Sequence, residues 1–392
     1  MSPSTQPPSD LVLHAGVALL PQGWCADVRL TIAEGRLVAV EAGVAASPQD
    51  EAHAVILPGM PNLHSHAFQR GMAGLAEARG PGEDSFWTWR DAMYRFVDRI
   101  GPEQLTALAA LAYAEMLESG FTRVGEFHYL HHDRDGTPFA DPAAMGGAIV
   151  AAAAETGIGL TLLPVFYAHA GFDRAPPAGG QRRFATDVDR FARLLESSRG
   201  HAAGLPDASV GVAPHSLRAV TPDELLALTA LAGDAPIHIH IAEQRREVEE
   251  CLRWSGARPV QWLLDHAPVA GNWCLVHATH MTATESADLA ASGAVAGLCP
   301  ITEANLGDGL FPAEPYLGAG GRIGIGSDSN VAIDCAGELR LLEYGQRLIS
   351  GRRSVLADAE TRSPGEYLFR RALAGGGQAL GVGAAGLSLG QA

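Results

Sequence analysis

Asn62-Leu63-His64-Ser65-His66 is the stretch that decides the predicted fold, and it closely follows the apolar, strand-like run Val55-Ile56-Leu57. Three more polar clusters stand where β-rich apolar runs stop: His240-Ile241-Ala242-Glu243, His277-Ala278-Thr279-His280 and Ser327-Asp328-Ser329. Imidazole nitrogen and carboxylate oxygen are donors that zinc takes, and a hydrolytic site leaves one coordination position open for water. The four clusters therefore predict a catalytic metal site at the ends of strands.

The runs that carry these clusters belong to an alternation of strands and helices. Eight strand-like runs cover residues 55–57, 122–127, 160–167, 209–214, 237–242, 274–278, 295–300 and 323–326. Helical segments lie between most of them, at 103–119, 141–156, 186–198, 222–232, 245–254 and 283–292. Eight strands separated by helices is the count for a closed parallel (β/α)8 barrel in the α/β class.

A doubly wound open sheet is the competing arrangement, but no GxGxxG follows an early strand. The placement of polar residues favours the barrel, because barrel enzymes hold their chemistry at the carboxyl ends of the strands. Seven residues stand at or just beyond such ends: His64, His66, His128, His215, His240, His277 and Asp328.

Composition limits the partners and the compartment. The 392 residues are 47% hydrophobic and carry a formal net charge of -16, which argues against nucleic acid or an anionic membrane as a partner. No run is long enough to span a bilayer, and the first ten residues lack a basic stretch leading into an apolar one. The five scattered cysteines include no CxxC pair, which favours a reducing compartment. We expect a cytoplasmic globular protein.

Strand geometry supports a shared metal ion, although it leaves alternatives open. Residues two apart in a strand point to the same face, so His64 and His66 can bind one ion. His238 and His240 share a face in the same way, and periodicity alone does not choose between them. Glu243 comes three residues after His240, within reach of a metal-bound water, but it is equally a first-turn carboxylate of the following helix.

The order HxH, HxxE, a histidine after a further strand, then SDS resembles the amidohydrolase superfamily, specifically its deaminase branch. The resemblance implies a TIM barrel with a small β-sandwich domain. Binuclear members bridge two metals with a carbamylated lysine, but all 28 basic residues here are arginine, so one Zn²⁺ per chain is expected. By this resemblance zinc is held by His64, His66, His240 and Asp328. The resemblance further implies that Glu243 is the proton shuttle and that His277 orients the water or polarises the substrate.

More specific segments are NLHSHAFQRG (62–71), FWTWRDAMYR (86–95), EFHYLHH (126–132), APHSLRAV (213–220), TEANLGDGLFP (302–312) and ELRLLEYGQRL (338–348). They closely resemble the N-formimino-L-glutamate deiminases, a family of histidine degradation. The resemblance implies zinc-dependent hydrolysis of N-formimino-L-glutamate to N-formyl-L-glutamate and ammonia, with Asp328 helping to take a proton from water. It implies a substrate pocket made of Gln69, Arg90, Tyr129, His215 and Arg218.

Charge supports this substrate class independently. A small-molecule amidine with two carboxylates needs fixed cations in a chain of net negative charge, and guanidinium binds carboxylate in a bidentate fork. Arg90 and Arg218 fit that need, although loop arginines are often solvated surface charges. The loop from Phe86 to Trp89 is expected to shield the site from bulk water.

Two other functions remain open from the residues. One is a deaminase or chlorohydrolase of an aromatic heterocycle such as guanine, cytosine or a triazine, which would need stacking and amide hydrogen bonds more than two arginines. The other is a catalytically inactive metal-binding scaffold, against which the presence of Glu243 speaks.

The predicted domains are the first part of the small β domain (1–57), the barrel (58–379) and a return towards the small domain (380–392). The chain stops about where the resembling family begins its final strands, so the small domain is expected to be incomplete, with an exposed sheet edge near residues 11–41. Asn330 stands where many relatives are expected to have histidine. A homodimer is expected.

Overall fold

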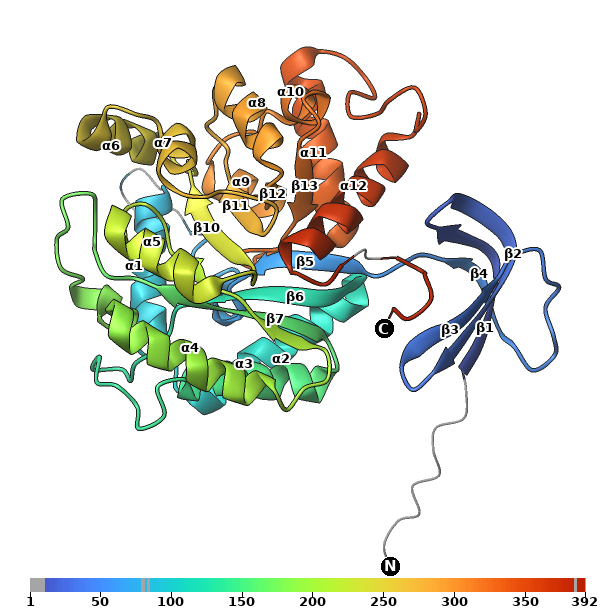
Figure 1. The fold of residues 1–392 in the computed structure, drawn as a ribbon, viewed down its shortest axis with the longest axis horizontal. Coiled ribbons are helices and arrows are strands. Elements are labelled where there is room, and N and C mark those ends of the chain that lie inside the picture. Colours follow the sequence, from blue (N-terminus) through green and yellow to red (C-terminus); the bar gives the residue numbers. More distant parts are fainter. Residues whose placement is uncertain (1–10, 79–81, 83–84, 384–385, 392) are drawn as a thin grey trace, which may run out of the picture. The chain divides into compact units, whose positions relative to one another are not determined.

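The computed structural model describes residues 11–78, 82, 85–383 and 386–391. The chain forms two compact units, one from the N-terminal residues to Gly59 together with the last residues of the chain, the other Met60–Gly383 (Figure 1). The domain limits predicted from the sequence stay a prediction.

The larger unit is a closed parallel barrel. Its sheet order is β10-β11-β12-β13-β5-β6-β7-β8, with β9 also paired to β7. Parallel bridges from Val212 to Ile237 and from Ser216 to His240 join the last strands to β10 and close the ring. The strands are β5 (Met60–Ser65), β6 (Phe121–His128), β7 (Gly159–Phe166), β8 (Ala208–Val210), β9 (Ala213–Pro214), β10 (Ile237–Ile241), β11 (Trp273–His277), β12 (Val295–Leu298) and β13 (Arg322–Ile325). Counting β8 and β9 as one interrupted strand gives the eight strands of the predicted fold.

One predicted strand is assigned to the wrong unit. The run at Val55 lies in β4 (Glu51–Ile56), which pairs with β1 in the small sheet, and Val55 is 56% exposed. The first barrel strand is β5, which contains His64 itself and is buried at every position. In the sequence, the apolar run at Val55 gave a stronger strand signal than β5 did, because β5 carries polar residues that form the site.

Helices surround the barrel strands in Figure 1. They are α1 (Phe86–Val97), α2 (Pro102–Ser119), α3 (Ala144–Thr156), α4 (Val188–Ala202), α5 (Pro222–Ala232), α6 (Arg245–Ser255), α7 (Pro259–His266), α8 (Ala283–Ser292), α9 (Pro300–Leu306), α10 (Ala313–Gly318), α11 (Cys335–Ser350) and α12 (Pro364–Ala379), with 3-10 turns η1 (Ala67–Met72) and η2 (Gly179–Arg183). Within the described residues, no helix has the length and apolar character needed to cross a membrane.

Local signals fix several of these helix ends. Gly120 has φ +100°, the left-handed conformation that terminates α2 as predicted. At the start of α5, the Thr221 hydroxyl accepts from the Glu224 amide and the Glu224 carboxylate accepts from the Thr221 amide. This capping box satisfies amides that would otherwise lack partners, and it explains why α5 has the predicted bounds.

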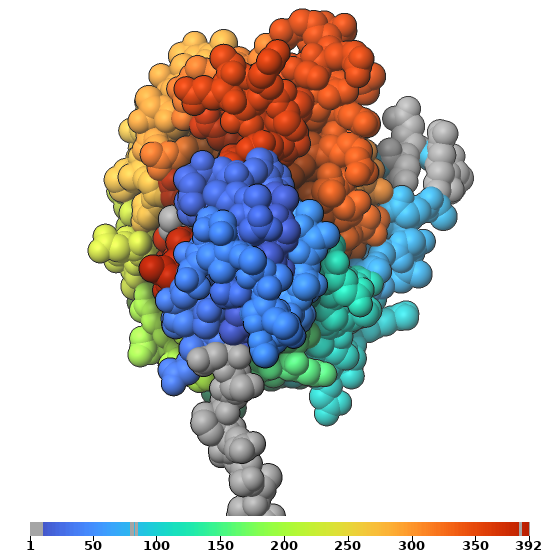
Figure 2. Space-filling model, turned by 90° about the vertical axis from the view of Figure 1, so that its right-hand side faces the viewer, coloured from blue at the N-terminus to red at the C-terminus, as the bar shows by residue number. Residues whose placement is uncertain are grey.

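The smaller unit is a four-stranded mixed sheet of order β3-β2-β1-β4. Its other strands are β1 (Leu11–Leu20), β2 (Gly23–Ala33) and β3 (Arg36–Glu41), drawn in blue in Figure 2. The end of the chain returns to β3: Leu37 donates to the Gln391 carbonyl and accepts from the Gly390 amide, both at 2.8 Å. The predicted open edge is therefore partly covered at β3.

A glycine-rich stretch lets α12 approach the barrel closely. A Cβ added at Gly375 would overlap the carbonyl oxygen of Ile323 in β13, and one at Gly376 would lie 3.0 Å from the Pro61 Cβ. Side chains at these positions would push the helix away from the strands, since the contacts are with backbone and a rigid ring.

We therefore expect Gly375→Ala to lower the free energy of unfolding by roughly 1–3 kcal/mol or more, the usual cost of overpacking. Denaturant unfolding measures this. Gly365→Ala is the matched control in the same helix, because its nearest neighbour is 3.9 Å away. Equal stability of the two variants would contradict the close packing.

Candidate functional site

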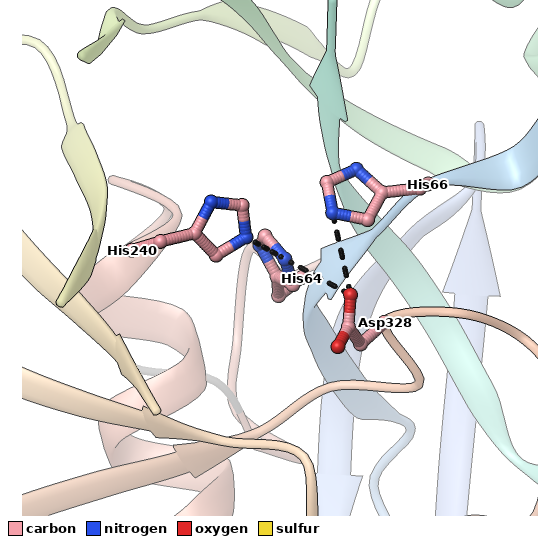
Figure 3. A group of neighbouring side chains, drawn as sticks. All are labelled: His64, His66, His240 and Asp328. Carbon is pink, nitrogen blue, oxygen red and sulfur yellow. Dashed lines mark hydrogen bonds and ion pairs between the residues drawn. The ribbon is translucent and has the colours of Figure 1, made fainter. Parts of the chain in front are cut away.

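Four predicted ligands meet at the carboxyl end of the barrel (Figure 3). His64 lies in β5 and His66 directly follows this strand, while His240 lies in β10 and Asp328 follows β13. The His64 and His240 Nε2 atoms are 3.0 Å apart, and Asp328 Oδ1 lies 3.4 Å from His64 Nε2 and 3.3 Å from His66 Nε2. All four residues are buried, and their ligand atoms lie within 4.8 Å of one another.

This donor set of three imidazoles and one carboxylate fits zinc. Zinc–ligand bonds are about 2.0–2.2 Å long, so the three measured separations of 3.0–3.4 Å are short enough for these atoms to bind one ion. His66 Nδ1 donates to the Phe127 carbonyl at 2.8 Å, which leaves the Nε2 lone pair facing the cluster. Burial lowers the pKa of His64 to about 3 and lowers the pKa of His66 and His240, so all three rings are neutral and able to bind metal.

Glu243 and His277 lie beside the ligands. The His277 Nε2 atom is 3.8 Å from Glu243 Oε1 and 3.8 Å from Asp328 Oδ2. Burial raises the pKa of Glu243 towards neutrality, as a proton-transfer residue needs. Burial alone would lower the pKa of His277, but the carboxylates of Glu243, Glu303 and Asp328 raise it overall.

The backbone at this rim is strained. Ala242, His277, Ala278 and Asp328 have φ values of +51°, +71°, +48° and +45°, in the left-handed region that non-glycine residues rarely adopt. Such conformations cost of order 1–3 kcal/mol each and persist where the surroundings determine them, typically at functional sites.

One cavity joins the ligand cluster to the predicted substrate residues. In the described part of the chain, neither Arg90 nor Arg218 forms an ion pair, and the Nε of each is buried without a hydrogen-bond partner. The Arg90 guanidinium stacks over Trp87 with 4.5 Å to the ring centroid. The cavity is lined by His66, Gln69, Phe86, Trp89, Arg90, Met93, Tyr94, Tyr129, Tyr167, Phe184, His215, Arg218, His240, Glu243, His277, Leu306 and Asp328.

The neutral pocket residues are held by local contacts. Gln69 Nε2 donates to the Tyr129 hydroxyl at 2.8 Å. The His215 ring packs edge-on against Tyr167, with centroids 4.8 Å apart. All five residues predicted for the substrate pocket therefore line the same cavity as Glu243 and His277.

The aromatic segment predicted as a loop is instead the first turn of α1, which begins at Phe86 after the cap residue Ser85. The aromatic residues themselves showed no helix-forming pattern in the sequence. The capping residue Ser85 precedes them, so it was not part of the segment that was interpreted. Phe86 and Trp89 do line the cavity.

Three histidines had no role assigned from the sequence, and each forms a hydrogen bond outside the metal-ligand cluster. His238 Nε2 contacts the Ala379 carbonyl, His280 Nε2 that of Asp308, and His132 Nε2 that of Ala185, at 2.7–2.9 Å. Sequence reasoning missed Glu303, whose Oε1 lies 3.3 Å from His277 Nδ1. Its place within α9 gave no strand-end signal, although it belongs to the quoted TEANLGDG segment. Tyr94, Tyr167 and Phe184 were also missed.

The fold and site define a metal-dependent hydrolase, and similarity to known proteins agrees. Residues 55–368 match the model of the amidohydrolase family, and residues 11–54 match the N-terminal domain of formimidoylglutamate deiminase HutF. The chain is 52% identical over 383 residues to the formimidoylglutamate deiminase of Pseudomonas aeruginosa, covering 97% of this chain and 84% of that protein.

Solved structures show the same fold. An amidohydrolase from Brucella melitensis has a TM-score of 0.95 and 58% identity, covering 97% of this chain and 85% of that one. An adenosine deaminase from Xanthomonas campestris, solved with bound zinc, has a TM-score of 0.78 and 23% identity, covering 98% and 83%. The chain belongs to the amidohydrolase family and, within it, to the formimidoylglutamate deiminases.

The cluster predicts which histidine of β10 binds metal. His240→Ala should reduce zinc from about one per chain to a small fraction, because one of four donors is lost. His238→Asn, two residues away on the same face, should keep its zinc. Elemental analysis after zinc loading measures both, and equal zinc content in the two variants would contradict the assigned ligand set.

Proposed function

We propose that this chain hydrolyses N-formimino-L-glutamate to N-formyl-L-glutamate and ammonia with one zinc ion per chain. The observation that carries the proposal is the pairing, in one cavity, of a three-histidine, one-aspartate cluster with two arginines that lack ion-pair partners among the described residues. The similarity to the Pseudomonas aeruginosa enzyme supports the same substrate.

The arginines account for recognition of a dicarboxylate. Arg90 and Arg218 each offer a fork of N–H donors to one carboxylate. Gln69, Tyr129 and His215 supply neutral polar contacts in the same cavity. A flat neutral heterocycle would leave both guanidinium groups in a partly enclosed site without an ion-pair partner among the described residues, which is costly.

His64, His66, His240 and Asp328 would hold the zinc. When bound, zinc supplies Lewis acidity that makes water a better nucleophile at neutral pH. Asp328 and Glu243 each accept one proton of the water as its oxygen bonds to the formimino carbon. Both protons then pass to the terminal amidine nitrogen, one from Glu243 and one from Asp328. The bond from carbon to this nitrogen breaks as the carbonyl forms, ammonia leaves, and both carboxylates are restored.

His277 stabilises the tetrahedral centre in this scheme. The neighbouring carboxylates raise its pKa, which favours a ring whose Nε2 donates to an oxygen that gains negative charge. The Glu303 carboxylate accepts a hydrogen bond from Nδ1, on the opposite side of the ring from Nε2, and so fixes the ring orientation.

Two broader proposals accompany the activity. Exposed apolar side chains on α11, including Leu348 at 84% and Ile349 at 64% exposure, support the predicted homodimer. The five cysteines are all unpaired, which supports a reducing, cytoplasmic compartment.

Glu243→Gln should keep its zinc but lower kcat by at least about a hundredfold, because the amide cannot relay a proton. Ammonia release and elemental analysis measure the two effects. Glu249→Gln, an exposed residue of α6, is the control and should turn over normally. Near-wild-type turnover by Glu243→Gln would remove it from the proton path.

Arg218→Met should lower kcat/KM for N-formimino-L-glutamate by about 10- to 100-fold, since a hydrogen bond to a charged group contributes about 1.5–3 kcal/mol. Zinc content should not change. Arg253→Met, exposed on α6, serves as the control. Unchanged kinetics of Arg218→Met, with turnover of guanine or cytosine, would favour the heterocycle alternative.

A further inference from the structure

Asn330 lies two residues beyond Asp328 and outside the substrate cavity. It is fully buried, and its φ of +55° lies in the left-handed region that asparagine tolerates better than most residues. The function proposed above gives it no role. A buried amide has two donors and an acceptor to satisfy, so its partners indicate what it does.

Those partners belong to the metal ligands and their neighbours. Asn330 Nδ2 lies 3.1 Å from the carbonyl oxygen of His66, 3.1 Å from that of Asp328 and 3.1 Å from the Ser65 hydroxyl. A single amide nitrogen thus contacts the backbone of two ligands from different strands. These ligands meet at Asp328 Oδ1 and His66 Nε2, 3.3 Å apart.

The orientation of this amide is set by a chain of hydrogen bonds. Asn62 Nδ2 donates to the Ser327 hydroxyl at 2.7 Å, and that hydroxyl donates to Asn330 Oδ1 at 2.6 Å. Because Oδ1 is engaged by a donor, the N–H groups are turned towards the carbonyls of His66 and Asp328.

Asp328 needs such support. Its φ of +45° is unfavourable for a residue with a side chain, and strained conformations persist only where neighbouring groups determine them. Two backbone bonds already tie it to β5: its amide donates to the His64 carbonyl at 3.0 Å, and its carbonyl accepts from the His66 amide at 2.9 Å. Asn330 Nδ2 donates one further hydrogen bond to the His66 carbonyl and one to the Asp328 carbonyl.

We infer that Asn330 is a positioning residue for the metal centre, which holds Asp328 in register with His66 so that both ligands face one ion. The inference rests on the metal centre proposed above. It assigns Asn330 a contribution to metal affinity, which is distinct from a contribution to folding alone.

Asn330→Asp tests this with little change of size, because it replaces the N–H donors with an oxygen that faces two carbonyl oxygens. We expect the Kd for Zn²⁺, measured by competition with a chelating dye, to rise at least about tenfold, the usual scale for groups that orient metal ligands. Asn272→Asp is the matched control, since Asn272 Nδ2 also donates to two carbonyls, of Gly233 and Ala235, away from the metal. This control should lose stability without losing zinc affinity.

Ser327→Ala is the second variant, to be measured if Asn330→Asp does not fold. It removes the hydroxyl that orients the amide and should raise the Kd in the same direction. A Kd within about twofold of wild type in folded Asn330→Asp, or in Ser327→Ala otherwise, would overturn the inference. An equal rise in Asn272→Asp would also overturn it. Failure of the wild-type chain itself to bind Zn²⁺ would instead overturn the proposed metal centre, and the inference with it.

Discussion

The Nε2 atoms of His64 and His240 face each other at 3.0 Å inside the mouth of the barrel, beside the carboxylate of Asp328. Burial keeps both rings neutral, so at this separation either a ring proton or a cation lies between the two nitrogens, and the Asp328 carboxylate favours the cation. The barrel makes this arrangement possible, because its closure between Ser216 and His240 brings β10 to the same rim as β5. The rest of the site is organised around this demand for positive charge.

The substrate pocket, in contrast, favours a negatively charged ligand. Arg90 and Arg218 bring two fixed positive charges into a cavity of a chain whose net charge is -16, and neither has an ion-pair partner among the residues described. Partly buried cations without a directly bonded anion are costly, so the pocket is suited to a ligand that supplies two carboxylates. One end of the cavity is thus suited to activating water and the other to anchoring carboxylates.

Much of this was predictable from local signals in the sequence. The helices at 103–119 and 222–232 were predicted to within a residue or two, because the caps that bound them, Gly120 and Thr221 with Glu224, depend on neighbours in the chain. The strand ends pointed to a metal site, but the choice of His240 over His238 came from the family resemblance, because both residues share one face of the strand. The run at Val55 was wrongly counted among the eight barrel strands, although its residues fell within the predicted small domain, since strand pairing is a long-range property. The sequence also could not show that Glu303 supports His277, because that contact joins a helix to another strand.

The most direct test of the account is ammonia release from N-formimino-L-glutamate by metal-free protein titrated with Zn²⁺. The account predicts that activity rises linearly and levels off at one zinc per chain, in step with bound metal. Zinc bound at one per chain with no ammonia released would contradict the proposed substrate. Full activity without bound metal would contradict the central role of the histidine cluster.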